Sequence, residues 1–444
     1  MAVPVYRGRF GKPQAERLLW RAGFGPRPGE AERLAKLGLE GAVHKLTNPG
    51  TDHLRGPKPH DSDGHRLAPF DAYGHDQLWW LDRMIRTTTP LRERMTLVWH
   101  DWFATSGDAS NARLMIRQNG LFRRHALGSF STLVTEVTCD PAMLLWLSGT
   151  DNEKDSPNEN YARELMELFT IGAGRGGYTE RDVREQARAL TGWRNDYDDN
   201  LGPVRFRYDK RRHDDGIKRI FGKRGRFDWK DSCRLCVHHR LHASFFVPKL
   251  WSYFIPTPPP RGTQRALQRL YVQHGHQVKP VVAAILRHPS LYMGPRMVKS
   301  PAVYTAGLLR SLKRGIDTEA WTWLMQLAGQ SLFYPPNVAG WDDTRWLDTA
   351  TYWARWEIAS HAIRPHVLDS DKARLPGDAT KLIRRAESLL GKPTVTGQTH
   401  AALKRFARTA LADADENWKK RAYPALIENA LRQLLASSPD LQTS

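Results

Sequence analysis

The sequence predicts an all-α fold: a large multi-helix orthogonal bundle with long irregular loops and at most a small hairpin. Three observations support this prediction. Apolar residues recur at helical spacing through most of the 444-residue chain. Pro and Gly stand mainly at the ends of these periodic segments, where they begin or end helices. Apolar residues make up 40% of the chain and Trp occurs 16 times, which is ample material for a large core.

Two long segments interrupt the helical periodicity in the first half of the chain. The stretch 48–72 contains several Pro, His and Gly residues and predicts an extended loop. The segment 195–229 predicts a second irregular loop with a short hairpin around Phe206 and Ile220, and long loops of this kind are often functional. Around them, helices are expected at 13–24, 28–46, 75–86, 90–105, 109–127, 129–138, 141–147, 158–171, 179–193 and 231–254.

The run PTPPP at 256–260 is the best candidate for a domain boundary, because consecutive prolines cannot continue a helix. We therefore expect an N-terminal helical region at 1–255 and a C-terminal helical region at 261–444, packed closely as one unit. Helices of the second region are expected at 263–274, 278–288, 301–313, 318–328, 346–363, 379–390, 400–420 and 424–436.

The chain is strongly basic, with 67 Lys and Arg against 47 Asp and Glu, a formal net charge of +20. This balance favours anions: an acidic protein, an anionic ligand, an anionic membrane surface or nucleic acid. The densest basic run, 205–226, includes Phe206, Tyr208 and Phe221, and such a mixture can contact phosphates and stack on bases. No established nucleic-acid-binding motif accompanies the run, so nucleic acid ranks last among these partners.

Three cysteines exclude a disulfide scaffold, and no apolar run has the length of a signal or spanning segment. We therefore expect a cytoplasmic protein without a membrane span. Cys233 and Cys236, spaced CxxC and followed by three histidines, could indicate zinc. Because they fall within an apparently continuous helix and no second CxxC exists, we interpret them as small buried hydrophobes.

Residues 158–172 read NENYARELMELFTIG. This segment resembles NENFARELLELFTLG, the signature of the DUF1800 family of uncharacterised bacterial proteins. The resemblance extends over roughly residues 13–442. Further matching blocks are, in order, RLLWRAGFGPRPGE, WHDWFATS, GYTERDVREQARALTGW, HDDGIKRIFGKRGRFDW, HASFFVPKLWSYFI, LFYPPNVAGWDDTRWL and LLASSPDLQ.

The resemblance carries no established reaction, substrate or cofactor. Family members are commonly exported and are often encoded beside DUF1501 proteins, which implies a DUF1501-like partner protein. The family's aromatic block often reads WHxHFAT with two histidines. Here His100 is kept, but Trp102 stands at the second position, and an indole nitrogen does not ligate metals.

The signature helix carries the candidate catalytic residues. Asn160, Glu164 and Glu167 lie along one stripe, and Arg163 lies on an adjacent one. Two carboxylates three residues apart can share a proton or a metal ion. Alternatively, Glu164 and Glu167 are structural ion-pair partners of arginines such as Arg163.

A metal site is expected if two other segments approach this helix. Nitrogen and carboxylate ligands together suit a divalent metal such as Zn, Fe or Mn, as in carboxylate sites of helix bundles. The candidate ligands are His100, Glu164, Glu167, His213 and Asp214.

The sequence thus supports two functions of different classes. The first is a metal-assisted enzyme, hydrolytic or redox, with a carboxylate/His site between helices. The alternative is a non-catalytic interaction or scaffold protein that binds an acidic partner, or nucleic acid, through a basic surface.

Overall fold

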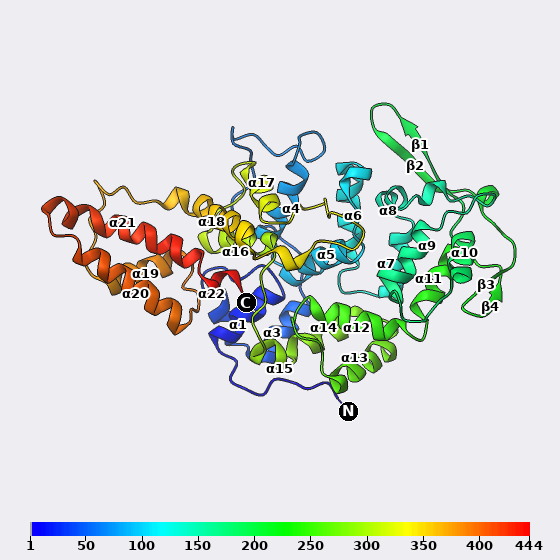
Figure 1. Cartoon of the computed structure of the whole chain (residues 1–444), viewed down its shortest axis with the longest axis horizontal. Helices are drawn as coiled ribbons and strands as arrows, with labels where there is room; N and C mark the ends of the chain where they lie inside the picture. The colour runs from blue at the N-terminus through cyan, green and yellow to red at the C-terminus, as the bar shows by residue number, and fades with distance from the viewer. Residues whose placement is uncertain (1) are drawn as a thin grey trace. The chain divides into compact units, whose positions relative to one another are not determined.

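A computed structural model of the chain describes residues 2–444. These residues are 56% helical, with 22 α-helices labelled α1–α22 in Figure 1. The prediction of a mainly helical fold is confirmed, but the described residues are not purely α-helical. They contain two small antiparallel sheets of two strands each, where at most one hairpin was expected.

The chain divides into two compact units that are discontinuous in sequence. Unit 1 comprises Arg92–His288 and Phe333–Trp341, with the chain start up to Val5; unit 2 comprises Tyr6–Leu91, Pro289–Leu332 and Asp342–Ser444. The boundary that we expected at 256–260 lies inside unit 1. The two predicted regions, 1–255 and 261–444, remain a prediction.

Unit 1 packs its helices around a cluster of aromatic side chains. Trp99, Trp102, Phe130 and Phe246 are all fully buried, with ring centroids of neighbouring pairs 4.8–5.8 Å apart. The helices of unit 1 are α5 (Pro90–Trp102, which begins in unit 2), α6 (Ala112–Arg124), α7 (Phe130–Thr138), α8 (Pro141–Trp146), α9 (Asn160–Glu164), α10 (Glu180–Ala189), α11 (Trp229–Val237), α12 (His242–Ser252), α13 (Arg261–Gln273) and α14 (Val278–Arg287).

Both hairpins fall in the segment 193–225, where one was expected. Strand β1 (Trp193–Asp198) pairs with β2 (Gly202–Tyr208), and the Asp198 side chain accepts hydrogen bonds from backbone N–H groups of the turn. Strand β3 (Lys218–Ile220) pairs with β4 (Lys223–Gly225). Their two-residue turn has positive φ at both positions, which is the geometry that joins antiparallel strands most tightly.

The helix predicted at 231–254 is interrupted. Helix α11 ends at Val237 and α12 begins at His242, so the prediction of one continuous helix is wrong. Two hydrogen bonds accompany the break: the His238 side chain bonds the Arg234 carbonyl, and His242 Nδ1 bonds the distant Thr170 carbonyl of the signature segment.

The signature helix is regular only at its start. After α9 the chain widens into a π-helix, η3 (Leu165–Thr170), and leaves it at Gly172 with φ of 95°. The carbonyls of its last three residues and that of Ile171, which follows it, lie at or near the core, where an unpaired backbone group is costly. Each accepts a side-chain hydrogen bond: Lys249 Nζ to Leu168 O (2.9 Å), Trp102 Nε1 to Phe169 O (3.1 Å), His242 Nδ1 to Thr170 O (2.8 Å) and Arg175 to Ile171 O (2.7 Å).

Unit 2 is built around α16 (Pro301–Leu312), which is apolar on all sides and buried along nearly its whole length. It packs against α4 (His75–Arg86), α17 (Ala320–Leu327) and α18 (Thr349–Ile363), as Figure 1 shows. The other helices of unit 2 are α1 (Lys12–Arg21), α2 (Glu30–Ala35), α3 (Gly38–Thr47), α15 (Pro289–Met293), α19 (Ala379–Leu389), α20 (Gly397–Ala412), α21 (Asn417–Ala436) and α22 (Pro439–Gln442).

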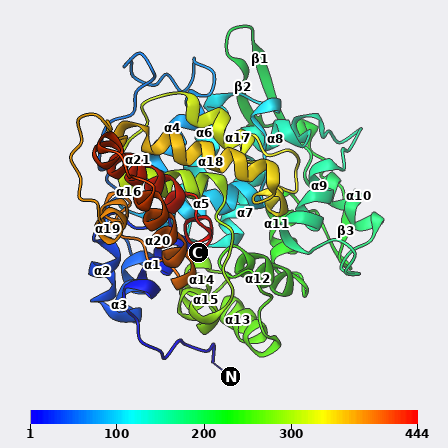
Figure 2. The same cartoon turned by 60° about the vertical axis from the view of Figure 1, so that its left-hand side comes forward.

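Helices α19, α20 and α21 pack against one another as a helical subassembly of unit 2 (Figures 1 and 2). Apolar side chains on one face of each helix form their contacts, for example Leu382 on α19 and Leu403 on α20, both nearly fully buried. Among the helices of residues 2–444, none combines the length and apolar composition that a membrane span requires.

We expect Trp102→Phe to lower the free energy of unfolding by about 1–3 kcal/mol, because it leaves the buried Phe169 carbonyl without its donor. Urea denaturation followed by circular dichroism measures the difference. Trp353→Phe is the matched control, since Trp353 is 57% exposed. Equal urea midpoints for the two variants would contradict the role given to Trp102.

Candidate metal site

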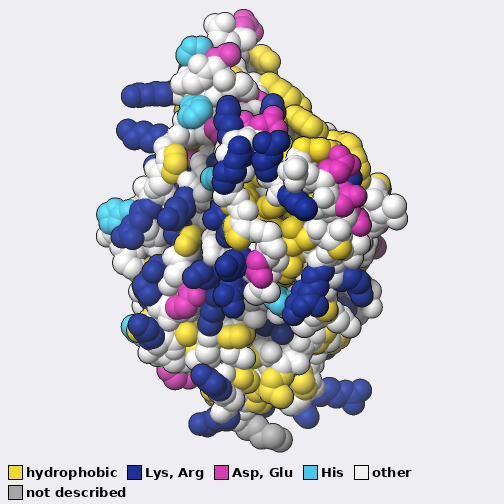
Figure 3. All heavy atoms as spheres, turned by 90° about the vertical axis from the view of Figure 1, so that its left-hand side faces the viewer, with side chains coloured by type: hydrophobic (Ala, Val, Ile, Leu, Met, Phe, Trp, Pro, Cys, Tyr) yellow, Lys and Arg dark blue, Asp and Glu magenta, His cyan; other side chains and the backbone are white. Residues whose placement is uncertain are grey.

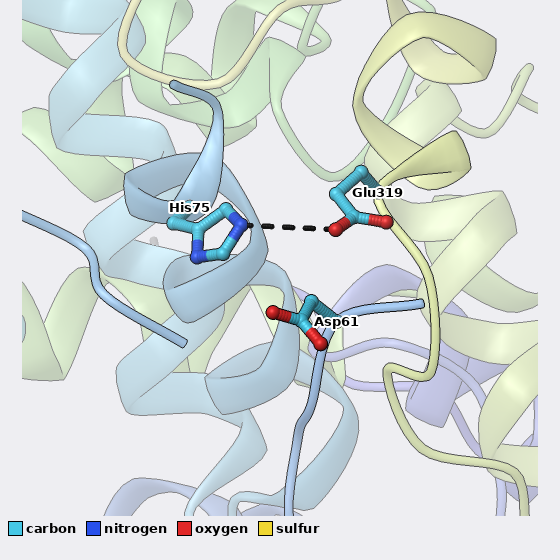
Figure 4. A group of neighbouring side chains, drawn as sticks. All are labelled: Asp61, His75 and Glu319. Atoms are coloured by element: carbon cyan, nitrogen blue, oxygen red, sulfur yellow. Dashed lines mark ion pairs between the residues drawn. The ribbon is translucent and has the colours of Figure 1, made fainter. Parts of the chain in front are cut away.

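One group of three potential metal ligands occurs among residues 2–444. It consists of Asp61, His75 and Glu319, all in unit 2, and one ligand atom of each lies within 4.8 Å of the others. Figure 4 shows the three side chains pointing toward one another from separate segments. Asp61 belongs to the loop 48–72, His75 is the first residue of α4, and Glu319 precedes the first residue of α17.

Local hydrogen bonds hold Asp61 in place. Its Oδ1 accepts the backbone N–H groups of Asp63 (3.1 Å) and His65 (2.7 Å), and its own N–H bonds the carbonyl of His65 at 3.0 Å. The loop is also tied to the chain before α17, because the N–H of His60 donates to the Ile316 carbonyl. The tight turn therefore presents Asp61 toward His75 and Glu319.

Both carboxyl groups favour the charged form. The hydrogen bond from Ser62 is the largest cause that lowers the pKa of Glu319. For Asp61, partial burial works to raise the pKa, but the N–H bond from His65 and the proximity of the His65 ring outweigh it and lower the pKa. Charged carboxylates are the form that ligates a divalent cation.

A backbone hydrogen bond determines which ring nitrogen of His75 carries the proton. The N–H of Ala68 donates to His75 Nδ1 at 3.0 Å, so the neutral ring carries its proton on Nε2, which faces Glu319 Oε1 at 3.9 Å. Metal binding through Nε2 would require the ring proton to move to Nδ1, which removes the bond from Ala68 and turns two N–H groups toward each other, at a cost of about 1–3 kcal/mol. Structural zinc sites supply roughly 10 kcal/mol or more, so this cost is small.

A fourth ligand stands within reach of the same group. His65 Nδ1 lies 3.6 Å from Asp61 Oδ2, and its side chain is exposed enough to turn. Two imidazoles and two carboxylates form a mixed N/O set that suits Zn, Fe or Mn. The candidate metal site is therefore Asp61, His75 and Glu319, with His65 beside it.

Two of the four sequence-predicted catalytic residues, Arg163 and Glu167, belong to one ion-pair group in unit 1. Arg163 contacts Glu180 at 2.8 Å and Glu159 at 3.1 Å, with Glu167 at 3.5 Å. Asn160 is exposed at the start of α9. The alternative that the carboxylates serve as arginine partners is thus realised for Glu167.

Glu164 differs from its neighbours because no ion pair of the described residues includes it. Partial burial, and then the nearby charge of Glu167, raise its pKa. Burial raises the pKa of Tyr178 to about 12, and Glu167 adds to that effect. A carboxyl with a raised pKa beside a second carboxylate is a feature of acid/base sites, so a catalytic role for Glu164 remains a prediction.

The other predicted ligands lie in separate surroundings. His100 is fully buried, its Nε2 bonds the Asn119 side chain at 3.1 Å, and burial holds its pKa well below the usual range. Asp214 bonds Arg188 at 2.6 Å, and His213 Nδ1 bonds Thr191. The structure does not bring these residues and Glu164 and Glu167 into one group of three ligands.

The two CxxC thiols are buried within unit 1. Cys233 Sγ contacts the Thr138 hydroxyl at 3.0 Å, and Cys236 Sγ accepts from Gln186 Nε2 at 3.2 Å. Burial raises the pKa of Cys233 to about 12 and that of Cys236 further still. Thiols that resist ionisation behave as small hydrophobes.

Sequence reasoning did not single out Asp61, His75 or Glu319. A local signal existed, because the run HDSDGH at 60–65 places two histidines and two aspartates within six residues. The partner Glu319 is more than 250 positions away, and no helical or strand periodicity links it to that run. Only the packing of α4 and α17 brings the three together.

Comparison with known proteins places the chain in a family. The family model described as a protein of unknown function (DUF1800) matches residues 17–443. No curated protein and no solved structure matches the chain. The match extends over nearly the whole sequence and includes the signature at 158–172, which forms the π-helix and its bonded carbonyls. This chain therefore belongs to the DUF1800 family.

Proposed function

We propose that the protein binds a divalent transition-metal ion through Asp61, His75 and Glu319 and uses it in a metal-assisted reaction, hydrolytic or redox. The observation that carries the proposal is the approach of three ligand atoms from three segments to within 4.8 Å of one another. Three protein ligands leave a coordination position for water or substrate, which a metal-assisted reaction needs.

The charges around the cluster support this proposal. Asp61 and Glu319 favour their ionised forms, and two carboxylates this close repel each other unless a cation or proton lies between them. A divalent cation would offset the repulsion and take lone pairs from all three side chains.

Elemental analysis of untagged protein, purified without chelators, tests the proposal. We expect close to one equivalent of Zn, Fe or Mn in the wild type and a loss of most of it in His75→Gln/Glu319→Gln, because the variant removes the imidazole ligand and one charge. Asp63→Asn is the matched control, since Asp63 is an exposed acid of the same loop that is not one of the three ligands.

The signature carboxylates are tested in the same experiment. Glu164→Gln/Glu167→Gln alters the predicted site in unit 1 and leaves the cluster of unit 2 intact. Metal retained by this variant and lost by the His75 variant assigns the metal to Asp61, His75 and Glu319. Metal lost only from the Glu164 variant, or a metal-free wild type that also fails to bind added Zn²⁺, contradicts the proposal.

A basic surface favours a second function, the binding of an acidic protein such as a DUF1501-like partner. Figure 3 shows many Lys and Arg side chains on the face toward the viewer, which includes α19, α20 and α21. Exposed cations of these helices that form no ion pair with the described residues are Lys381, Arg384, Arg405, Arg408, Lys420 and Arg421. In the basic run 205–226, by contrast, Arg205 and Arg207 share the carboxylate of Asp196.

We expect the protein to bind immobilised poly-glutamate at low salt and to release it as salt rises, because exposed charges are screened over about 8–10 Å at physiological ionic strength. Arg405→Gln/Arg408→Gln should elute earlier in a salt gradient than Arg205→Gln/Arg207→Gln. The reason is that Asp196 already neutralises part of the charge of Arg205 and Arg207, so their loss weakens binding less. Stronger retention on single-stranded DNA, reduced only by the Arg205 variant, would instead support nucleic acid as the partner.

A further inference from the structure

Two hollows of unit 2 share part of their walls, and together they are called the cationic cavity here. The first has a volume of about 420 Å³ and the second about 340 Å³, and Arg27, Arg33 and Arg55 line both. The first extends between α2, α3 and the loop that begins at 48, and the second extends toward the end of α16. Their volumes lie in the range of small-molecule sites.

The cavity wall carries a large excess of positive charge. Five further basic residues line one hollow or the other: Lys45, His53, Arg310, Lys313 and Arg314. Glu30 is the one carboxylate among the lining residues of the described chain. It is already engaged by the backbone N–H of Arg27 at 2.8 Å and by Arg310 at 3.4 Å.

Six of the eight basic residues of this wall fall into two groups. Arg310 and Arg314 are structural, because Arg310 bonds the carbonyls of Gly25 and Ile85 and Arg314 pairs with Asp317 at 2.7 Å. The second group has no carboxylate partner among residues 2–444 and is exposed at the cavity: Arg33, Lys45, Arg55 and Lys313.

Arg27, which lines both hollows, lies among like charges. Burial lowers the pKa of Arg27, and the nearby charges of Arg55 and Arg86 lower it further, against the opposite effect of Glu30. A folded chain that gathers like charges around a hollow has a site where an anion relieves their repulsion. Leu34 and Leu46 add apolar side chains to the lining of the first hollow.

Neutral donors lie next to the cations. The first hollow is lined by Asn48, Thr51 and the threonines at 87–89. Thr87 already donates to Asp52 and the Asn48 amide to the His44 carbonyl, whereas the Thr88 hydroxyl accepts the N–H of His53 and keeps its own O–H to donate. Guanidinium forks beside hydroxyl and amide groups match phosphate oxygens and an adjoining polar body.

We propose that this cationic cavity binds a small organic phosphate, with Arg33 and Arg55 contacting the phosphate oxygens and Lys45 and Lys313 standing at the two ends. The proposal does not rest on the metal site. The same loop builds both features, since Arg55 and Gly56 line the cavity and Asp61 follows five residues later. A phosphate ligand would therefore also order the loop that carries Asp61.

Isothermal titration with inorganic pyrophosphate at low salt tests this site. We expect saturable binding to the wild type and a loss of affinity of about tenfold or more in Arg33→Gln/Arg55→Gln, about 1.4 kcal/mol or more. Arg384→Gln/Arg405→Gln removes two exposed cations from α19 and α20 and is the matched control, with an affinity close to that of the wild type. Citrate, a carboxylate of similar charge, should bind more weakly.

Two further measurements separate phosphate binding in this cavity from binding at the metal site and from a loss of folding. His75→Gln/Glu319→Gln should bind pyrophosphate like the wild type, which separates this cavity from a metal-bound phosphate. Circular dichroism should show the same melting temperature for each exposed-arginine variant as for the wild type. No saturable binding by the wild type, an equal loss in the Arg384 variant, or tighter binding of citrate than of pyrophosphate would overturn the proposal.

Discussion

The end of the signature π-helix is the constraint on which unit 1 depends. A helix leaves its last carbonyls without intrahelical donors, and here those carbonyls lie at the core. Four side chains from other segments supply the missing hydrogen bonds, among them Trp102 from α5 and Lys249 and His242 from α12. Each bond fixes the position of the element that donates it, so the helices around η3 have little freedom.

These bonds also set the chemistry of the donors. Burial lowers the pKa of Lys249 to about 8, and its ammonium lies 4.5 Å from the centroid of the Trp102 ring, which favours the cation. Burial lowers the pKa of His242 to about 3, so the ring is neutral and donates through Nδ1 to Thr170 while Nε2 accepts the hydroxyl of Tyr271. The aromatic and histidine blocks of the family sequence thus serve packing around one helix end.

For His242 and His75, the neighbouring backbone group determines which ring nitrogen carries the proton. A carbonyl next to His242 fixes its proton on Nδ1, whereas an N–H next to His75 fixes the proton on Nε2. His242 is buried in the core, and its two ring nitrogens bond Thr170 and Tyr271. His75 faces two carboxylates, and its Nε2 would bind the proposed metal ion once the ring proton had moved to Nδ1.

Charge is distributed differently in the two units. Around the signature, arginines meet carboxylates, as Arg163 meets Glu180, and most of the charge is neutralised locally. In unit 2, Arg33 and Arg55 face a hollow with no carboxylate of their own. Part of the net charge of +20 is therefore concentrated at this hollow, which we propose to be an anion site.

The sequence predicted the helical class and most helix positions, because helical periodicity is a local pattern that apolar burial preserves. Helix α16, for example, coincides almost fully with the expected 301–313. The departures arise where side chains compete with the regular backbone. The π-helix at 165–170 and the break between α11 and α12 both depend on hydrogen bonds to distant residues, which periodicity does not register.

By itself the sequence determined the family, the mainly helical fold and the excess of positive charge, since all three follow from motif order, local spacing and composition. Tertiary structure decided which residues meet. It placed Trp102 as a hydrogen-bond donor to Phe169 where the sequence suggested a lost ligand, and it brought Glu319 to Asp61 and His75. The physical reason is that ligand geometry and hydrogen bonding depend on distances between segments far apart in the chain, and only packing sets those distances.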